Sequence, residues 1–375
     1  MGAHRRTDAR CRDPPVPADA EHRRPHDHRE PAHRHERWRV PARVEDAADQ
    51  SAGPGARIGA ARMIELPDET LIELEGCDGQ WWPLAGPGQW GRGVCLADED
   101  EGTDFDGMYE SPVTAIYNST AFEVGAHFGG TREEKFDFIL ALHVKGEKGT
   151  PWRYIDSAFR NSLSFRRESK LWVATGDSRR RLPVRLGAKV NIKAVNDPNS
   201  EQYGKLLVPL VGAYPRWVED PAVSTFITQT DTTGGGTETG YVTVSNPLPE
   251  DYEIWPVWQI QASAAGMVVT LPDYSWGSDL YDRAEEDALR KVVLAPLLAG
   301  EHLEINTDKM AWGGQFNSSL DTEFPQRMGG RRLNYSIPGR TKPTQVPVTV
   351  TGAPAGTGIR VLCPRPWPRP WGGEA

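Results

Sequence analysis

The chain has 375 residues, of which 25% are charged and 38% are hydrophobic, and its formal net charge is −9. This length allows two domains with separate cores. The acidic balance argues against a general nucleic-acid-binding role. Because no long apolar segment is present, the sequence predicts neither a secretion signal nor a membrane helix. We therefore expect a soluble protein that is made in a cytoplasm.

The proline and glycine content indicates the fold class. The chain has 31 prolines, 38 glycines and many Val, Thr and Trp positions, with few runs of helical period. This composition favours an all-β protein with long loops. The four cysteines form no CxxC pair, which argues against a zinc ribbon or a redox motif. We expect free thiols, and neither a metal nor a cofactor.

Residues 1–62 differ in composition from the rest of the chain. They contain thirteen arginines, six of the nine histidines, no lysine and no Leu, Phe, Tyr or Asn, so they cannot form a core. They could be a basic arm that binds a metal or a phosphate backbone, but translation upstream of the true start gives the same composition. We favour a disordered or non-native extension, with Met63 as the true start. Thirteen arginines against ten acidic residues give +3 here and leave −12 for the remainder.

Residues 63–221 are expected to form a β-domain with one helix. Residues 136–144 alternate between apolar and polar side chains, which is typical of a half-buried strand. A helix is predicted by Thr150 as N-cap, Pro151 at the first helical position and an apolar stripe that ends at Leu163. Further strands are expected at residues 71–74, 171–174, 181–186, 190–195 and 206–211.

Two motifs in this domain are weak signals for binding. The glycines of residues 86–91 match the GxGxxG pattern of dinucleotide-binding loops. Pro87 lies inside the motif and no helix follows it, so we expect no nucleotide site. The acidic residues 98–106 lack the spacing of a calcium loop and are expected to form a solvated loop.

A second β-domain is expected at residues 222–350, with the boundary at Glu219–Pro221. Ile254, Trp258 and Ile260 share one face of a strand, which predicts that Trp258 lies in a core. Strands are expected at residues 222–229, 241–245, 292–294, 303–306, 332–335 and 346–350.

Three further features of this half concern prolines and a helix. Pro256 cannot donate a hydrogen bond to a neighbouring strand, which predicts that its strand lies at a sheet edge or carries a bulge. A short helix is expected at residues 278–290. Residues 351–375 are expected to form an extended, proline-rich tail that does not fold alone.

No catalytic constellation is found. The sequence lacks a GxSxG elbow, an HExxH motif, a Walker loop and a cysteine in a recognisable nucleophile setting. His127, His143 and His302 are expected to be structural. The basic runs at residues 179–181 and 331–332 are expected to be interface or surface charges. We therefore expect no enzymatic activity and no catalytic residues.

Several stretches, taken in their order along the chain, carry a resemblance. In the first half they are WWPLAG (81–86), GVCLAD (93–98), residues 112–113, RRRLPVRL (179–186) and residues 197–198. In the second half they are residues 246–247, residues 255–258, LPDYS (271–275), LLAGEHLEINTD (297–308), residues 324–325, residues 335–338 and the closing stretch 346–372. Together they resemble the distal tail proteins, which are minor tail proteins of siphophages, here of the kind that infects actinobacteria.

The resemblance covers residues 63–375 and implies a fold and a role. It implies an N-terminal ring-forming β-domain and a C-terminal galectin-like β-sandwich, assembled as a homohexamer at the virion tail tip. The family is structural: its ring is an adaptor between the tail tube protein and the hub, tape-measure and receptor-binding proteins, and it is assembled in the host cytoplasm without nucleic acid or membrane. Residues 1–62 and the insertions at 98–106 and 278–286 depart from the family.

A different class of function remains open beside this one. Trp255, Trp276 and Trp312 could be exposed platforms on which a sugar ring stacks. The chain would then be a carbohydrate-binding β-sandwich that recognises host cell-wall polysaccharide. A β-sandwich glycosidase is a third hypothesis. These three tryptophans are the interaction surface that the sequence nominates.

Overall fold

The computed structural model describes residues 69–147 and 149–373, all of which belong to one compact unit. The predictions for residues 1–62 and for a start at Met63 lie outside the described residues. Most of the described chain that has regular structure is β-strand, so the all-β fold class is confirmed. In this part of the chain no helix has the length and apolarity needed to cross a membrane.

The regular elements are mostly strands, joined by a few short helical segments. The strands are β1 (Leu71–Glu75), β2 (Trp81–Ala85), β3 (Val94–Leu96), β4 (Val113–Asn118), β5 (His127–Glu133), β6 (Phe136–Lys145), β7 (Ser169–Ala174), β8 (Arg179–Leu186), β9 (Asn191–Lys193), β10 (Tyr203–Gly212), β11 (Trp217–Ile227), β12 (Thr237–Asn246), β13 (Val257–Ile260), β14 (Val268–Pro272), β15 (Lys291–Val293), β16 (Leu303–Asn306), β17 (Phe316–Ser318), β18 (Thr341–Thr351) and β19 (Gly358–Trp367). The helical segments are η1 (Glu99–Glu101), α1 (Phe105–Tyr109), α2 (Trp152–Asn161), α3 (Pro198–Glu201) and α4 (Phe324–Arg327).

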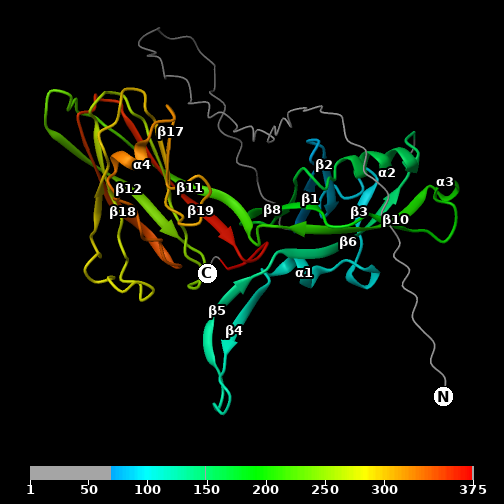
Figure 1. Cartoon of the computed structure of the whole chain (residues 1–375). Helices are drawn as coiled ribbons and strands as arrows, with labels where there is room; N and C mark the ends of the chain where they lie inside the picture. The colour runs from blue at the N-terminus through cyan, green and yellow to red at the C-terminus, as the bar shows by residue number, and fades with distance from the viewer. Residues whose placement is uncertain (1–68, 148, 374–375) are drawn as a thin grey trace, which may run out of the picture. The chain divides into compact units, whose positions relative to one another are not determined.

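Backbone hydrogen bonds join most of the strands into one large antiparallel sheet. Its main path is β17-β16-β13-β19-β11-β8-β10-β6-β3, and β1, β2, β7 and β9 pair beside this path. A second sheet has the order β12-β18-β14-β15, and β4 pairs only with β5. Figure 1 shows the β4–β5 hairpin extending away from β6 and α1. The hairpin is therefore a separate feature of the fold.

The N-terminal half confirms the strongest sequence predictions. Strand β6 buries Phe136, Phe138 and Leu140 while Asp137 is exposed, and it pairs with β10 along its whole length. The expected helix is α2, which is shorter than predicted and has Pro151 in the N-cap position with no side-chain cap hydrogen bond. The apolar stripe of α2 is buried, as periodicity predicts.

Helix α2 packs on the N-terminal sheet through aromatic side chains. The ring of Phe159 lies edge-on to the ring of Trp82, with centroids 5.3 Å apart. The indole nitrogen of Trp82 donates to Ser162 Oγ at 2.7 Å, just beyond the helix. Because both rings are buried and the polar indole atom has a partner, this contact fixes the helix on the sheet at little desolvation cost.

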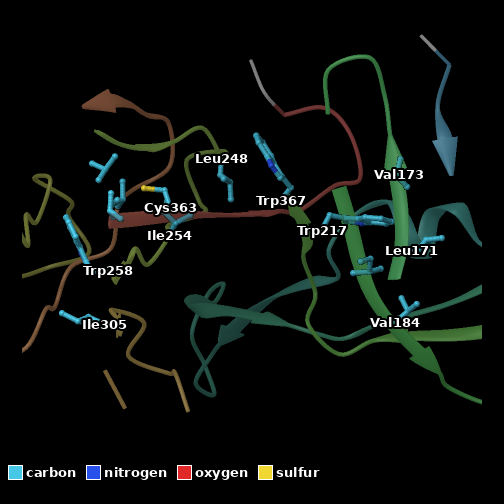
Figure 2. Packing of buried hydrophobic residues seen from close by; sticks show 14 of the residues in the cluster. Leu171, Val173, Val184, Trp217, Leu248, Ile254, Trp258, Ile305, Cys363 and Trp367 are labelled. Carbon is cyan, nitrogen blue, oxygen red and sulfur yellow. The ribbon is translucent and has the colours of Figure 1, made fainter. Parts of the chain in front are cut away.

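The second half is a sandwich of two sheets. The buried positions alternate along the strands of each: Val242 and Val244 on β12, and Trp258 and Ile260 on β13. Figure 2 shows Trp258 near Ile305, as expected for the core side of the β13–β16 pair. The prediction that Trp258 is buried is confirmed, since its side chain is 1% exposed.

One carboxylate is fully buried in this sandwich. Glu301 accepts hydrogen bonds from Arg327 Nη2 and Thr322 Oγ1 and from the backbone nitrogen of Leu298. Burial alone would raise the pKa of Glu301, but these hydrogen bonds and the charge of Arg327 outweigh it and lower that pKa below its ordinary value. The carboxylate is therefore held charged inside the fold.

Strands β11 and β19 connect the two halves. The predicted boundary at Glu219–Pro221 lies inside β11, where the pairing with β19 shifts register. Such a shift is expected at Pro221, which cannot donate to a ladder. Within the expected tail, residues 358–367 form β19, which pairs with β11 on one side and β13 on the other. That segment is extended, as expected, but it is a central strand.

Four local predictions are wrong. Pro256 precedes β13, which lies between β16 and β19 and pairs with both without a shift of register, so it is neither an edge strand nor a bulged one. Residues 278–290 form successive turns instead of a helix, and residues 332–335 form no strand. Arg180, expected among surface charges, is fully buried: its guanidinium lies 3.9 Å from the centroid of the Trp367 ring and donates to two carbonyl oxygens of residues 369 and 372.

Candidate interaction surface

The β4–β5 hairpin is the longest exposed regular element of the described chain. Every residue of β4 is exposed, and so is every residue of β5 except Gly130. The two strands pair only with each other, and their register shifts between Ile116 and Tyr117. Both outer edges therefore present backbone groups that bond no other strand of the described chain.

The hairpin carries large apolar side chains with no core to enter. They are Val113, Ile116, Tyr117, Phe122, Val124 and Phe128. The rings of Tyr117 and Phe128 contact each other across the two strands, with centroids 5.9 Å apart. A lone two-stranded hairpin is marginally stable in water, and exposed apolar side chains beside free strand edges make this hairpin the candidate surface for contact with another protein.

The two ends of the hairpin are fixed to the body by backbone groups. The amide of Glu134 donates to Pro112 O at 2.9 Å, which closes the hairpin. Ser111 is buried, and its hydroxyl donates to Pro215 O at 2.6 Å while its amide donates to Pro368 O at 2.9 Å. Residues before β11 and after β19 therefore hold the first strand of the hairpin.

Two arginines hold the same ends through carboxylates. Arg216, which directly precedes β11, is 7% exposed and bonds Glu133 at the end of β5. Arg369, two residues after β19, donates from Nη2 and Nε to Glu110 Oε1 at 2.8 and 3.0 Å. The hydrogen bond to Glu110 raises the pKa of Arg369 above its already high value, so this guanidinium stays charged.

Arg216 also contacts the sandwich. Its guanidinium lies 4.7 Å from the centroid of the Tyr252 ring, in the loop after β12, and Nη1 donates to Pro215 O at 3.0 Å. Burial is the main reason that the pKa of the Tyr252 hydroxyl is raised, so Tyr252 stays neutral beside the cation. The guanidinium is thus shared between the hairpin and the sandwich.

The structure places the three nominated tryptophans in different environments. Trp312 is fully exposed, in the turn that Gly313 and Gly314 close with positive φ. Trp255 is half-buried beneath the ammonium of Lys309, which lies 5.2 Å from its ring centroid. Trp276 is half-buried and packs edge-on against Tyr274.

These tryptophans do not form one platform in the described structure. Trp276 lines a cavity of about 20 Å³, next to Trp258 and Asp273, which is room for a single water molecule. Trp255 and Trp312 line neither this cavity nor the hollow beside Pro249, Arg340 and Pro368. The nominated set is therefore one exposed ring and two partly covered ones.

A polar cluster lies on the β3–β6–β10 face. His143 is hydrogen-bonded through Nε2 to Glu101 at 2.7 Å and through Nδ1 to the Tyr203 hydroxyl at 2.6 Å. The hydrogen bond to His143 lowers the pKa of Glu101. Across residues 69–147 and 149–373, no group of three or more His, Cys, Asp or Glu side chains is placed to hold a metal ion.

The sequence interpretation missed the hairpin, although its signal is present. Residues 113–118 read VTAIYN, a run rich in β-branched and aromatic residues between Pro112 and a turn that begins with Ser119 and Thr120. Alternation between apolar and polar residues, the criterion that identified β6, is absent here because neither face is buried. The arginine contacts at the hairpin's ends join residues far apart in the sequence and leave no local pattern.

Comparison with known proteins gives relatives but no matching family model. The chain is 27% identical over 346 residues to minor tail protein Gp27 of Mycobacterium phage D29, a match that covers 82% of this chain and 99% of the relative. Gp27 of Mycobacterium phage L5 is 27% identical over 348 residues, with the same coverage.

Several solved structures match this chain over nearly their whole length at low sequence identity. The Dit protein (gp 19.1) of phage SPP1, described as a paradigm of hub adsorption apparatus in phages that infect Gram-positive bacteria, matches with a TM-score of 0.47 at 7% identity. The match covers 79% of this chain and 98% of that protein. The curated relatives confirm the resemblance drawn from the sequence: over most of its length the chain is similar to minor tail proteins of mycobacteriophages.

Proposed function

We propose that this chain forms a homohexameric ring at the distal end of the tail tube. The ring is an adaptor that joins the tube protein to the hub, tape-measure and receptor-binding proteins, and its role is non-enzymatic. The observation that carries the proposal is the β4–β5 hairpin, whose unpaired edges and exposed aromatic side chains suit a neighbouring copy of the same chain.

The hairpin suits a ring better than a two-fold dimer. Its apolar side chains lie on both faces and near the tip, for example Ile116 and Phe122. One projecting element that docks on a different surface of the next copy makes a head-to-tail contact, and such contacts form a ring when the rotation between copies closes. The domain arrangement behind this proposal is a ring-forming domain at residues 63–221 and a galectin-like sandwich at residues 222–350.

The test measures the mass of the purified chain by size-exclusion chromatography with light scattering. We expect six times the chain mass of 41.5 kDa. Because Pro112 O and the Glu134 amide already bond each other, residues 113–132 can be replaced by two glycines without opening the fold, and Glu133 is kept as the partner of Arg216. This variant should be a monomer with an unchanged melting temperature.

A matched pair of substitutions controls for the loss of apolar surface. Phe122→Ser removes a fully exposed side chain from the hairpin, and Val195→Ser removes one from the loop after β9. The first should weaken the oligomer, and the second should not. A monomeric wild-type chain that is retained on host cell-wall polysaccharide through Trp312 would favour the carbohydrate-binding alternative instead.

A further inference from the structure

Both anchors of the hairpin lie at one end of the β11–β19 ladder. Trp217, the first residue of β11, pairs with Trp367, the last residue of β19. Arg216 directly precedes this pair, and Arg369 follows it by two residues. Figure 2 shows Trp217 and Trp367 close to each other, where β11 and β19 reach the N-terminal sheet. The rest of the ladder belongs to the sandwich, where β19 pairs with β13.

The end of the ladder is rigidly held. Trp217 is fully buried and its indole nitrogen donates to Met108 O, in α1, at 3.2 Å. The indole nitrogen of Trp367 donates to the Glu219 carboxylate. The buried guanidinium of Arg180 stacks on Trp367 and donates to the carbonyl oxygens of Arg369 and Gly372, at 2.9 and 3.0 Å. Arg369 therefore extends from a fixed backbone.

We propose that Arg216 and Arg369 are positioning residues of the hairpin, which fix its direction relative to the ladder by holding Glu133 and Glu110. The inference rests on the proposed function in one respect, that the hairpin is the self-association surface. Glu110 lies just before β4 and Glu133 ends β5, and each carboxylate is bonded to an arginine next to the end of one ladder strand. Two fixed points on two strands stop the hairpin from swinging about its closing hydrogen bond.

The Arg216–Glu133 and Arg369–Glu110 pairs differ in solvent exposure, and this difference decides which pair is suited to a test. Arg216 is nearly buried and also contacts Tyr252, so its replacement alters the sandwich as well. The side chains of Arg369 and Glu110 are 44% and 54% exposed. Their charges can be exchanged without burying an unpaired group. The Arg369–Glu110 pair is therefore the one to reverse.

The experiment measures the direction of the hairpin by the distance between two spin labels. One label is placed at Ser119→Cys near the hairpin tip and the other at Ala188→Cys in the body, both exposed positions. Cys11 and Cys77 are replaced by Ser, and the buried Cys95 and Cys363 are kept. Labelled chains are diluted with unlabelled chains, so that each distance is measured within one copy.

We expect one narrow distance distribution for the otherwise unaltered chain. Arg369→Glu or Glu110→Arg alone places like charges together, and the distribution should widen at least about twofold, because repulsion replaces the bond. The double variant, with both changes, should restore the narrow distribution. If Arg369 had only a structural role unrelated to Glu110, exchanging the two charges in the double variant would not restore the narrow distance distribution.

The control is Arg132→Glu. Arg132 bonds Glu134 at 2.8 Å within the closed end of the hairpin and makes no contact with the ladder in the described structure, so its reversal should leave the distribution narrow. A broad distribution in the unaltered chain, an unchanged width after Arg369→Glu, or no rescue in the double variant would each overturn the proposal. Light scattering on the same samples separates the two ideas: a monomer with a narrow distribution contradicts the ring and leaves the positioning role intact.

Discussion

The β4–β5 and β11–β19 pairs are both long antiparallel ribbons, but their surroundings are opposite. In β19, Ile359, Val361 and Cys363 are buried, and both edges of the strand are paired. In β4 every side chain is exposed and one edge is free. The β11–β19 ribbon is held by the core of its own chain. The β4–β5 ribbon has its apolar side chains in solvent. The comparison therefore separates apolar surface that stabilises the monomer from apolar surface that is available to another protein.

The largest effect should come from the end of the buried ribbon. Trp217→Ala removes a fully buried ring and the donor to Met108 O. We expect a loss of about 3–5 kcal/mol in the free energy of unfolding, because the cavity cannot be refilled. Chemical denaturation measures this value. A loss below about 1 kcal/mol, which is small for a large-to-small core substitution, would contradict the assignment of this ribbon as the connection that both halves need.

The second effect concerns the buried carboxylate of the sandwich. Arg327→Met leaves Glu301 without its cation, and we expect a cost of about 3 kcal/mol at neutral pH, since an uncompensated charge remains buried. The double variant Arg327→Met/Glu301→Gln is the control, and it should recover part of this loss. A single variant as stable as the wild type would show that the ion pair contributes nothing.

The same carboxylate gives the wild-type chain a definite pH dependence. The folded pKa of Glu301 lies below its unfolded value of 4.5. Its contribution to stability is therefore complete above the unfolded pKa and is lost as the pH falls through the folded pKa. The stability difference between the wild type and Arg327→Met should narrow in this acid range. Denaturation curves measured at pH values from neutral to acid test it, and a constant difference is the contrary result.

A substitution on the exposed hairpin should weaken the oligomer and leave the stability of the monomer nearly unchanged. Phe128→Ala removes a ring that is 62% exposed, and surface changes of this kind alter the free energy of unfolding by about 0.5 kcal/mol or less. The oligomer should nevertheless weaken, because the lost ring belongs to the proposed contact. Thermal melting and light scattering on one sample check both parts. A large drop in melting temperature would place Phe128 in the fold of the monomer.

The smallest effect is expected at Trp312, which is fully exposed. Trp312→Ala should leave the melting temperature unchanged, and under the adaptor proposal it should also leave the hexamer intact. Binding to host polysaccharide provides the discriminating measurement. Loss of measurable glycan binding in this variant would support the carbohydrate-binding alternative.

The sequence predicts strands, helices and core residues correctly where one face is buried, because burial imposes a regular spacing of apolar residues along the chain. Strand β6 and helix α2 were predicted because one face of each is apolar, and Trp258 was placed in a core by the same reasoning. The turns at residues 278–290 show the limit of this approach: a helix-like spacing of apolar residues did not produce a helix, and Leu280 and Leu289 are exposed.

The candidate surface could not be predicted in the same way. The hairpin has no buried face, so its strands carry no alternation. The four prolines near the C-terminus, at positions 364, 366, 368 and 370, suggested a tail, although Ile359, Val361 and Cys363 recur at the two-residue spacing of a strand. Which strands β19 would join, and which carboxylates Arg216 and Arg369 would meet, depends on tertiary contacts between distant segments.

The central position of β19 has a consequence for folding during synthesis. Strand β19 is made after every other strand of the two sheets, and it separates β11 from β13 in the large sheet. A ribosome must therefore translate this segment before the sandwich can close. Until then β11 and β13 each lack the partner that β19 supplies on one edge. Contacts across so long a stretch of chain form slowly. We infer that the nascent chain carries these two open strand edges from the synthesis of β13 until that of β19, a period in which premature pairing with another chain must be avoided.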